Sequence, residues 1–256
     1  MLLACDVGNS TTVVGLFRGP DLLHHWRVST DPEGTPDELA LQLAGLTRFV
    51  GLDLSTDVDG LIVSSVVPPV TETFRRMAER YVAEPPIVVE PGVRTGLALR
   101  VDTPRDIGAD RIVNAVAAYH LYGGPAIVVD FGTATSFDAV NGRGEFVGGA
   151  IAPGVSTSAD ALVTRAARLP KVETATPPAA IGRTTVTALQ SGIVFGAAGQ
   201  VDAIVRRIQR ELGPGVTTVA TGGLASAVLE ACETLDHHDP WLTLKGLRLI
   251  WERNQG

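Results

Sequence analysis

The 256-residue sequence is poor in the features that mark several classes of protein. Only two cysteines, Cys5 and Cys232, are present, so no disulfide framework is expected and a reducing compartment is favoured. Lysine and arginine number 21 against 28 aspartate and glutamate residues, a formal net charge of −7. This shortage of positive charge argues against a nucleic-acid partner, because such proteins need basic surface to displace counterions from phosphates. A small anionic ligand stays compatible with it, since backbone amides and a metal ion can hold one.

Long apolar runs are also missing. No uninterrupted run approaches the roughly 20 residues that a membrane-spanning helix needs. We therefore expect no membrane partner and a cytoplasmic protein. Hydrophobic residues make up 45% and charged residues 19% of the chain, which is the composition of a folded globular protein with a well-buried core.

The first half of the chain mixes strand and helix patterns. The sequence predicts strands at 2–7, 12–17 and 23–30, a helix at 35–51, a strand at 59–68, a helix at 69–82 and a strand at 86–90. Thr35, Pro36 and Glu38 have the spacing of a helix N-cap, first turn and capping box. A further helix is predicted over 103–124, capped by Thr103.

A motif of the first half returns in the second. The segment AIVVDFGTATSFDAV repeats the first hairpin, and Asp130 aligns with Asp6, 124 residues earlier. Each copy has an apolar strand, Asp-x-Gly, small polar residues and a second apolar strand. The chain continues with a predicted strand at 144–154, helices at 156–170 and 184–212, a strand at 216–221, a Gly-Gly turn and a helix at 224–235. The repeat predicts two similar α/β domains, residues 1–115 and 116–256, with a ligand in the cleft between them.

The repeated Asp-x-Gly turn has the chemistry of a phosphate-binding hairpin. Glycine lets the backbone approach a ligand, successive N–H groups form an anion-binding nest, and hydroxyls add donors. The aspartate would repel phosphate, so we expect it to act through a cation or its water shell. A single copy is usually only a turn, but two copies favour a pair that clamps a nucleotide polyphosphate and its metal. The later segment VATGGLAS, residues 219–226, adds a Gly-Gly turn suited to a flat or anionic group, with an ordinary strand-to-helix turn as the alternative.

These motifs resemble those of a known superfamily. The two hairpins followed by a Gly-Gly turn resemble the acetate kinase, sugar kinase, Hsp70 and actin superfamily, which implies an α/β fold of two similar actin-like (ribonuclease H-like) domains with an interdomain active-site cleft. More narrowly, DVGNSTTVVGLF, PGVRTGL, GADRIVN, VVDFGTATSFDAV, GGAIAPGV and QSGIVFG resemble type III pantothenate kinase over nearly the whole chain. The resemblance implies phosphorylation of pantothenate by ATP at the first step of coenzyme A synthesis. It also implies a homodimer, Mg²⁺ with the ATP, and a monovalent cation, potassium or ammonium.

The resemblance also implies roles for residues of both hairpins. The first hairpin would bind the phosphates of ATP, and its matching residues are Asp6, Val7, Gly8, Asn9, Ser10, Thr11, Thr12 and Val13. Asp6 would orient water bound to the divalent metal. In the second hairpin, Asp130 would bind the monovalent cation and Thr133 would contact a nucleotide phosphate. The alternative for both hairpins is an ordinary turn.

The segment GADR matches the family's pantothenate-binding segment, Gly108, Ala109, Asp110 and Arg111. The resemblance makes Asp110 the general base for the primary hydroxyl that attacks the γ-phosphate. On the predicted helix Asp106 would share a face with Asp110, so repulsion would raise the proton affinity of one of them. A solvated acidic stripe is the alternative.

Thr185 aligns with a family threonine that contacts pantothenate from the partner subunit's side of the dimer, or else is an early residue of a helix capped by Thr184. Val101 departs from the pattern, because many members carry a substrate-contacting tyrosine there. The segment DHHD, residues 236–239, is predicted to be an exposed polar loop rather than a zinc site.

Two other functions stay open at this point. One is a non-catalytic, nucleotide-binding regulatory protein on the same fold. The other is a kinase of another small hydroxyl compound, favoured if Val101 reshapes the pocket. The presence of Asp110 beside Asp6 and Asp130 favours an enzyme, because a binding module has no need of a base.

Overall fold

The computed structural model describes residues 1–82, 84–166 and 169–255. The contacts divide the chain into two compact units, which are described separately below. Unit 1 comprises Met1–Gly96, Thr103–Ala117 and Thr243–Gly256, and unit 2 comprises Leu97–Asp102 and Ala118–Leu242.

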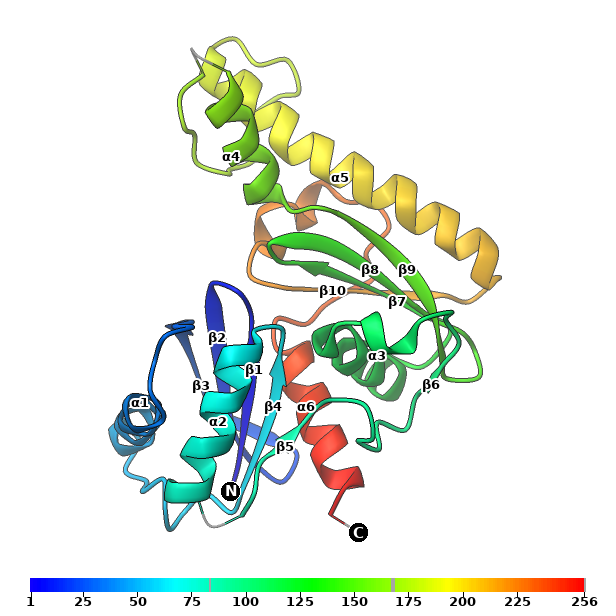
Figure 1. Ribbon diagram of the computed structural model, residues 1–256. Helices are drawn as coiled ribbons and strands as arrows, with labels where there is room; N and C mark the ends of the chain where they lie inside the picture. The colour runs from blue at the N-terminus through cyan, green and yellow to red at the C-terminus, as the bar shows by residue number, and fades with distance from the viewer. Residues whose placement is uncertain (83, 167–168, 256) are drawn as a thin grey trace. The chain divides into compact units, whose positions relative to one another are not determined.

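Unit 1 is built on a five-stranded sheet with the order β3-β2-β1-β4-β5 (Figure 1). Its strands are β1 (Leu2–Val7), β2 (Thr11–Arg18), β3 (Asp21–Ser29), β4 (Gly60–Ser65) and β5 (Ile87–Val88). The first three strands form an antiparallel meander, and β4 and β5 add in parallel. The strands predicted at 2–7, 12–17, 23–30, 59–68 and 86–90 are all present, and all but the first have shifted ends.

Two helices cover one face of this sheet, α1 (Pro36–Phe49) and α2 (Pro68–Tyr81). The apolar side chains of β1 that face them, Leu3, Cys5 and Val7, are buried in one core cluster with residues of both helices. Because side chains alternate along a strand, Asp6 points to the opposite face. The capping box predicted at the start of α1 is present.

A helix that the sequence did not predict, α6 (Leu242–Arg253), packs within unit 1. Gly60 and Gly246 allow the close approach, because a Cβ at these positions would overlap Trp251 and the backbone of Val113 respectively. The last residues of the chain therefore pack with the first ones. The predicted division at residue 115 assigns α6 to the second domain, whereas the structure places it, from Thr243 on, in unit 1.

Unit 2 repeats the sheet of unit 1 and adds one strand. Its order is β11-β10-β7-β8-β9-β6, so β9-β8-β7-β10-β11 corresponds to β3-β2-β1-β4-β5. Its strands are β6 (Ala98–Leu99), β7 (Ala126–Phe131), β8 (Ala134–Val140), β9 (Glu145–Pro153), β10 (Thr217–Thr221) and β11 (His237–His238). The duplicated α/β architecture is thus confirmed, with β6 as the extra edge strand.

An ionic cluster attaches the β6 segment to unit 2. The Arg100 N–H donates to the Phe146 carbonyl oxygen at 2.8 Å, and the Arg100 guanidinium pairs with Glu145 at 3.0 Å. Glu145 also accepts hydrogen bonds from Asn141 and Arg143. These contacts explain why residues 97–102 belong to unit 2 although they precede residues of unit 1.

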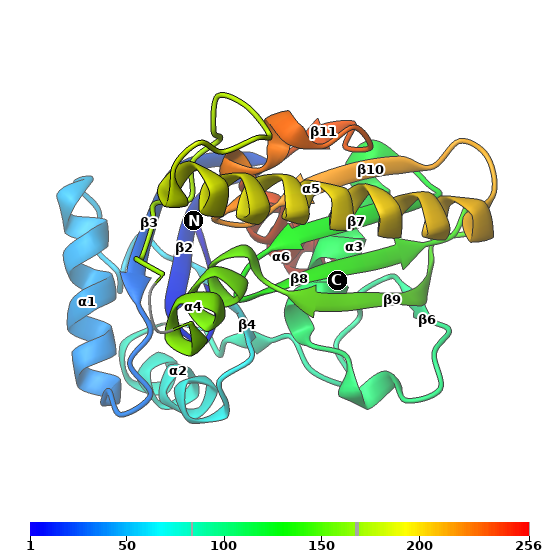
Figure 2. The same ribbon diagram turned by 90° about the horizontal axis from the view of Figure 1, so that it is seen from above.

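The long helix α5 (Thr185–Leu212) covers one face of the second sheet (Figure 2). Its side chains Ala198, Val201 and Val205 are buried in one core cluster with Ile127 and Val129 of β7. By length and composition α5 is the one helix in the described ranges that could cross a membrane. Its burial against the sheet is equally typical of the core helix of a globular unit, so this is weak evidence for a membrane.

Two predicted helices are wrong in detail. The helix predicted over 103–124 is broken into the 3-10 helix η1 (Pro104–Asp106) and α3 (Ala109–Tyr122), because Ile107 between them is extended, and the Thr103 side chain makes no cap. The helix predicted over 224–235 is two 3-10 turns. The chain beyond them is held by Asp202 of α5, which accepts hydrogen bonds from residues 233 and 234.

The segment DHHD is not a loop. His237 and His238 form β11, while Asp236 accepts the N–H of Thr218 at 2.8 Å and Asp239 accepts the hydroxyl of Tyr122 at 3.0 Å. In the described part of the chain no group of three or more metal-ligating side chains is found. The helix predicted over 156–170 corresponds to α4 (Val155–Arg165); residues 167 and 168 lie outside the described residues.

Candidate functional site

The first Asp-x-Gly hairpin forms a tight turn at the end of β1 and β2. The Gly8 N–H donates to the Thr11 carbonyl oxygen at 3.0 Å, and Asn9 and Ser10 at the tip are exposed. The two-residue turns favoured in hairpins need a positive φ, but no described residue other than glycine has one. This turn is therefore not of type I′ or II′, and contacts from elsewhere in the chain hold it against the third strand.

That support comes from Thr30, directly after β3. Its hydroxyl donates to the Gly8 carbonyl oxygen at 2.8 Å, and its N–H donates to the Ser10 carbonyl oxygen at 3.1 Å. The Thr12 and Thr30 hydroxyl oxygens are 2.9 Å apart. Because Thr30 donates its only hydroxyl proton to the Gly8 carbonyl oxygen, the Thr12 hydroxyl is the donor in this pair. Thr12, a predicted ATP-binding residue, is buried and so helps to support the turn.

The tip of the turn presents backbone donors. Within the described residues, the N–H groups of Asn9 and Ser10 make no hydrogen bond to another protein group. Consecutive unengaged N–H groups at a turn are suited to an anion. Of the other predicted residues here, Val7 is buried, whereas Thr11 and Val13 are half-buried at the start of β2.

Asp6 lies on the sheet face opposite to α1 and α2, beside Ser64 of β4 in the strand register. The Ser64 hydroxyl is fully buried and has no hydrogen-bond partner among the described residues. A carboxylate with a neighbouring orphan hydroxyl fits a hydrated Mg²⁺, which binds one or two carboxylates and keeps several waters. These two residues are the ones that would hold a divalent metal in unit 1.

The GADR segment lies at the same end of unit 1. Val66, which follows β4, donates its N–H to the Val7 carbonyl oxygen at 3.1 Å. A Cβ built on Gly108 would lie 3.9 Å from the Val66 side chain and 2.5 Å from Asp110 Oδ1. Glycine at 108 therefore leaves the space that the Asp110 carboxylate occupies, and this space lies near Val66, which is hydrogen-bonded to the end of β1.

Asp110 stands in the first turn of α3, and its Oδ1 accepts the N–H of Arg111 at 2.9 Å. Burial raises the pKa of Asp110 above its ordinary value of 3.8, against the opposing effects of the Arg111 N–H and the Arg111 charge. Asp106 lies in η1 rather than on α3. The prediction that the two carboxylates share a helix face is therefore wrong, and burial is the cause of the raised pKa.

The second Asp-x-Gly hairpin joins β7 to β8 through Gly132 and Thr133. The Gly132 N–H donates to the Ala134 carbonyl oxygen at 3.0 Å. The Thr133 carbonyl oxygen accepts both the Gly154 N–H at 3.2 Å and the Thr157 hydroxyl at 2.7 Å. The Thr133 residue itself is exposed, as a residue that contacts a ligand phosphate must be.

Asp130 lies one residue before the end of β7, between Thr221 of β10 and Ser136 of β8 in the strand registers. These neighbours place hydroxyl-bearing residues on either side of the carboxylate. Gly222 has φ +95°, and a Cβ on it would lie 2.5 Å from Asp130 Oδ1 and 2.6 Å from the Phe131 nitrogen. This oxygen-rich surrounding fits a monovalent cation, which prefers oxygen ligands.

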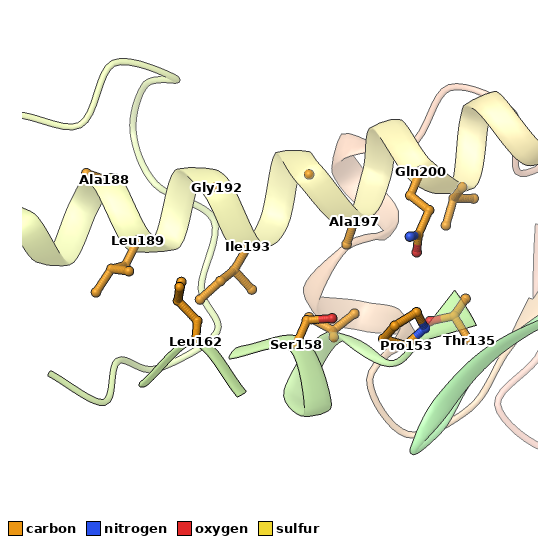
Figure 3. Close-up of a pocket in the computed structure, with 13 residues that line it drawn as sticks. Thr135, Pro153, Ser158, Leu162, Ala188, Leu189, Gly192, Ile193, Ala197 and Gln200 are labelled. Carbon is orange, nitrogen blue, oxygen red and sulfur yellow. The ribbon is translucent and has the colours of Figure 1, made fainter. Parts of the chain in front are cut away.

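Thr185 is the first residue of α5 and is exposed, next to the N-cap Thr184, whose hydroxyl accepts the Thr187 N–H. The same helix borders a groove of about 350 Å³ within unit 2. Figure 3 shows Leu189, Ile193 and Ala197 directed from α5 toward Leu162, Ser158 and Pro153. Gly192 and Gly196 of α5 also line the groove.

The sequence did not single out Thr30, Ser64 or Thr157. A signal for the first was present, because the offset that aligns Asp6 with Asp130 also aligns Thr30 with Gly154, and both donate an N–H to their turn. Ser64 and Thr157 depend on strand pairing and on the path of α4, which the motifs do not specify.

Two duplicated sheets, each with an Asp-x-Gly hairpin, define a protein of the actin-like kinase fold. Among solved structures, the chain resembles the inorganic polyphosphate/ATP-glucomannokinase from Arthrobacter (TM-score 0.51, 14% identity, 98% of this chain and 97% of that one). It also resembles the ROK hexokinase from Thermus thermophilus (TM-score 0.50, 17% identity, 97% of each chain). At these identities the likeness concerns the fold.

The chain belongs to the type III pantothenate kinase family, whose sequence model matches residues 2–207. It is 54% identical to the type III pantothenate kinase of Streptomyces avermitilis over 261 aligned positions, 99% of this chain and 98% of that protein. It is 55% identical to the type III pantothenate kinase of Thermobifida fusca over 258 positions, 99% of this chain and all of that protein. The expected resemblance is therefore confirmed.

Proposed function

We propose that the chain transfers the γ-phosphate of ATP to the primary hydroxyl of pantothenate, with Asp110 as the group that accepts the hydroxyl proton. As a family member, the chain is a kinase that phosphorylates pantothenate in coenzyme A biosynthesis. The product is 4′-phosphopantothenate. The observation that carries the role of Asp110 is its burial and raised pKa at the start of α3.

Asp110 suits this role because its raised pKa brings its proton affinity closer to that of a neutral-pH base. In its ionised form it accepts the proton as the hydroxyl attacks. Phosphoryl transfer passes through a loose transition state, in which positioning and charge neutralisation dominate. Asp110 therefore also serves to orient the hydroxyl, and Gly108 gives its carboxylate the room to do so.

The first hairpin binds the ATP phosphates through its backbone. Asn9 and Ser10 supply N–H donors, and the hydroxyls of Ser10 and Thr11 add side-chain donors. Mg²⁺ supplies charge neutralisation on the phosphates when bound, and Asp6 and Ser64 are the residues that would hold it. In the second hairpin Thr133 contacts a phosphate, and Asp130 holds the monovalent cation.

Pantothenate binds at residues 108–111. Arg111 supplies a positive charge in this segment, which suits the carboxylate of pantothenate. Val101 is half-buried and offers only apolar contact where relatives use a tyrosine. We infer that this exchange weakens one substrate contact without removing a carboxylate that the reaction needs.

We propose that the chain forms a homodimer through unit 2 and works in the cytoplasm. Ile151 of β9 is 64% exposed, Val186 of α5 45% and Leu162 of α4 43%, and Leu162 lines the same groove as Gly192. Exposed apolar side chains beside glycines suit the close packing of a second copy. Thr185 at the start of α5 would then reach the pantothenate of the partner.

The proposal is tested by measuring ADP formation by the wild-type protein with pantothenate, with a panel of other small hydroxyl compounds, and with no acceptor. We expect turnover that depends on pantothenate and is stimulated by potassium over sodium. Turnover with another acceptor only would identify a different kinase. Tight ATP binding with no acceptor-dependent turnover would support a regulatory protein instead. Molar mass in solution tests the dimer.

A further inference from the structure

We propose that Thr30 and Thr157 are positioning residues that hold the two phosphate turns in their ligand-ready conformations. The inference rests on the proposed role of both hairpins in ATP binding. Neither residue belongs to the hairpins, and each acts through a carbonyl oxygen of a turn.

The contacts of Thr30 carry the first half of the inference. Its hydroxyl and its N–H bind the carbonyl oxygens of Gly8 and Ser10, on either side of the turn tip. Carbonyl oxygens that point toward Thr30 leave the intervening N–H groups free to face another direction. This turn lacks the positive φ of standard two-residue hairpins, and the Thr30 contacts hold it against the third strand.

The second hairpin contains the same device built from other residues. The Thr133 carbonyl oxygen accepts a threonine hydroxyl, from Thr157 at 2.7 Å, and a backbone N–H, from Gly154. A side chain at 154 is excluded, because its Cβ would lie 2.5 Å from the Gly132 carbonyl oxygen. The hydroxyl therefore comes from the first turn of α4. In both hairpins the carbonyl oxygens of the turn accept one backbone N–H and one threonine hydroxyl, on two carbonyls in the first and on a single carbonyl in the second, which indicates that this support belongs to the phosphate turn.

The Thr30 and Thr157 hydroxyls both act as hydrogen-bond donors, so the informative substitutions are those that remove the donor and those that keep it. Valine has the shape of threonine but donates no hydrogen bond, whereas serine keeps the hydroxyl and loses only a methyl group. Thr30→Val and Thr157→Val should therefore release the turns, and Thr30→Ser and Thr157→Ser should not. Thr73→Val is the control, because the Thr73 hydroxyl is also within hydrogen-bond distance of backbone carbonyl oxygens, those of Pro69 at 3.1 Å and Gly34 at 3.3 Å, and neither acceptor belongs to a hairpin turn.

The experiment measures steady-state kinetics and, separately, ATP binding by calorimetry without pantothenate. Each valine variant should raise the KM for ATP and the Kd for ATP by about 3- to 10-fold, the effect of one net hydrogen bond, with the KM for pantothenate unchanged. The serine variants should bind ATP within about 2-fold of wild type, as should Thr73→Val.

Several results would overturn the proposal. Valine variants that bind ATP like wild type exclude a positioning role. Equal rises in both KM values, or equal losses in Thr73→Val, point to general destabilisation instead. If a valine variant fails to fold, the serine variant decides, because weakened ATP binding in a folded serine variant contradicts a role for the hydroxyl alone. A wild-type protein that binds ATP without phosphorylating pantothenate would refute the proposed function, yet the binding measurement would still test Thr30 and Thr157.

Discussion

The two Asp-x-Gly hairpins occupy the same place in their sheets but are supported by different residues. In the first, Thr30 supplies both the N–H and the hydroxyl that bind the turn. In the second, Gly154 supplies the N–H and Thr157 the hydroxyl. The comparison teaches that the backbone contact is the shared element. The side-chain contact is supplied from wherever space allows, because no Cβ fits at 154.

The surroundings of the two aspartates differ more than the turns do. Asp6 lies beside the buried Ser64 hydroxyl, which has no hydrogen-bond partner in the part of the chain that the structure describes, and shares unit 1 with Asp110. Asp130 lies between Thr221 of β10 and Ser136 of β8 in the strand registers, and against Gly222. The first surrounding suits a hydrated divalent metal at the reaction, and the second suits a less strongly hydrated monovalent cation.

The largest expected effects come from removing the carboxylate charge of Asp6 and, in a separate variant, that of Asp130. Asp6→Asn should lower kcat/KM for ATP by roughly 100-fold or more, because metal-based charge stabilisation contributes several kcal/mol. Asp130→Asn should lower it by only about 10-fold and shift the potassium concentration needed for half-maximal activity. Steady-state kinetics over magnesium and potassium titrations measure both. If the potassium response changed in Asp6→Asn and the magnesium response in Asp130→Asn, the two assignments would be reversed.

A smaller effect is expected from Gly222, which lies against Asp130 of the second hairpin. Among the described residues no glycine is in the same place against Asp6. Gly222→Ala combines a positive φ with a Cβ against the Phe131 backbone, and should destabilise the protein by about 2–4 kcal/mol. Gly215→Ala is the control, because Gly215 has φ +75° but nothing within 4 Å of its Cβ position, and should lose about 1 kcal/mol. Thermal unfolding compares them. Equal losses would mean that contact with the second hairpin plays no part.

The smallest effect concerns the start of the third strand, where Asp21 and Glu145 correspond. Asp21 is exposed, whereas hydrogen bonds from Asn141 and from the guanidiniums of Arg100 and Arg143 lower the pKa of Glu145 from 4.5 to about 2. A carboxyl whose pKa is lower in the folded state stabilises the fold above its unfolded pKa and loses this contribution as the pH falls. The Tm of the wild type should therefore fall between pH 4.5 and about 2 more steeply than that of Glu145→Gln. Asp21→Asn should keep the wild-type slope, and parallel curves for all three proteins would exclude the cluster.

The repeated motifs were sufficient to predict the duplicated sheets, since hydrophobic alternation and the Asp-x-Gly turns are local signals. The break in the helix predicted over 103–124 was missed, because neither the extended Ile107 nor the nearby Val66 side chain is visible in a local helical pattern. The helix α6 was missed as well, and with it the return of the chain to unit 1. These errors share a cause, namely contacts between residues far apart in the sequence.

For the candidate site too, the sequence predicted what the motifs contain and missed what depends on long-range contacts. Residues with a motif, such as Asp6, Asp110 and Asp130, were named from the sequence, and they still await a direct test of their roles. The sequence did not identify the supporting residues Thr30, Ser64 and Thr157, because none of them belongs to a recognisable motif. Only the strand register and the hydrogen bonds distinguish them from other serines and threonines.

The most direct test of the central claim follows the transferred phosphate in wild type and Asp110→Asn. With ATP, pantothenate, magnesium and potassium, phosphorus NMR of the wild-type reaction should show a phosphomonoester forming in step with ADP. Asp110→Asn should bind ATP normally and form this product at least roughly 100-fold more slowly, the contribution of a general base. Its Tm at neutral pH should be no lower, because burial raises the pKa of Asp110 and its ionised form therefore destabilises the fold. A wild-type rate in folded Asp110→Asn, or no phosphomonoester from the wild type, would contradict the account.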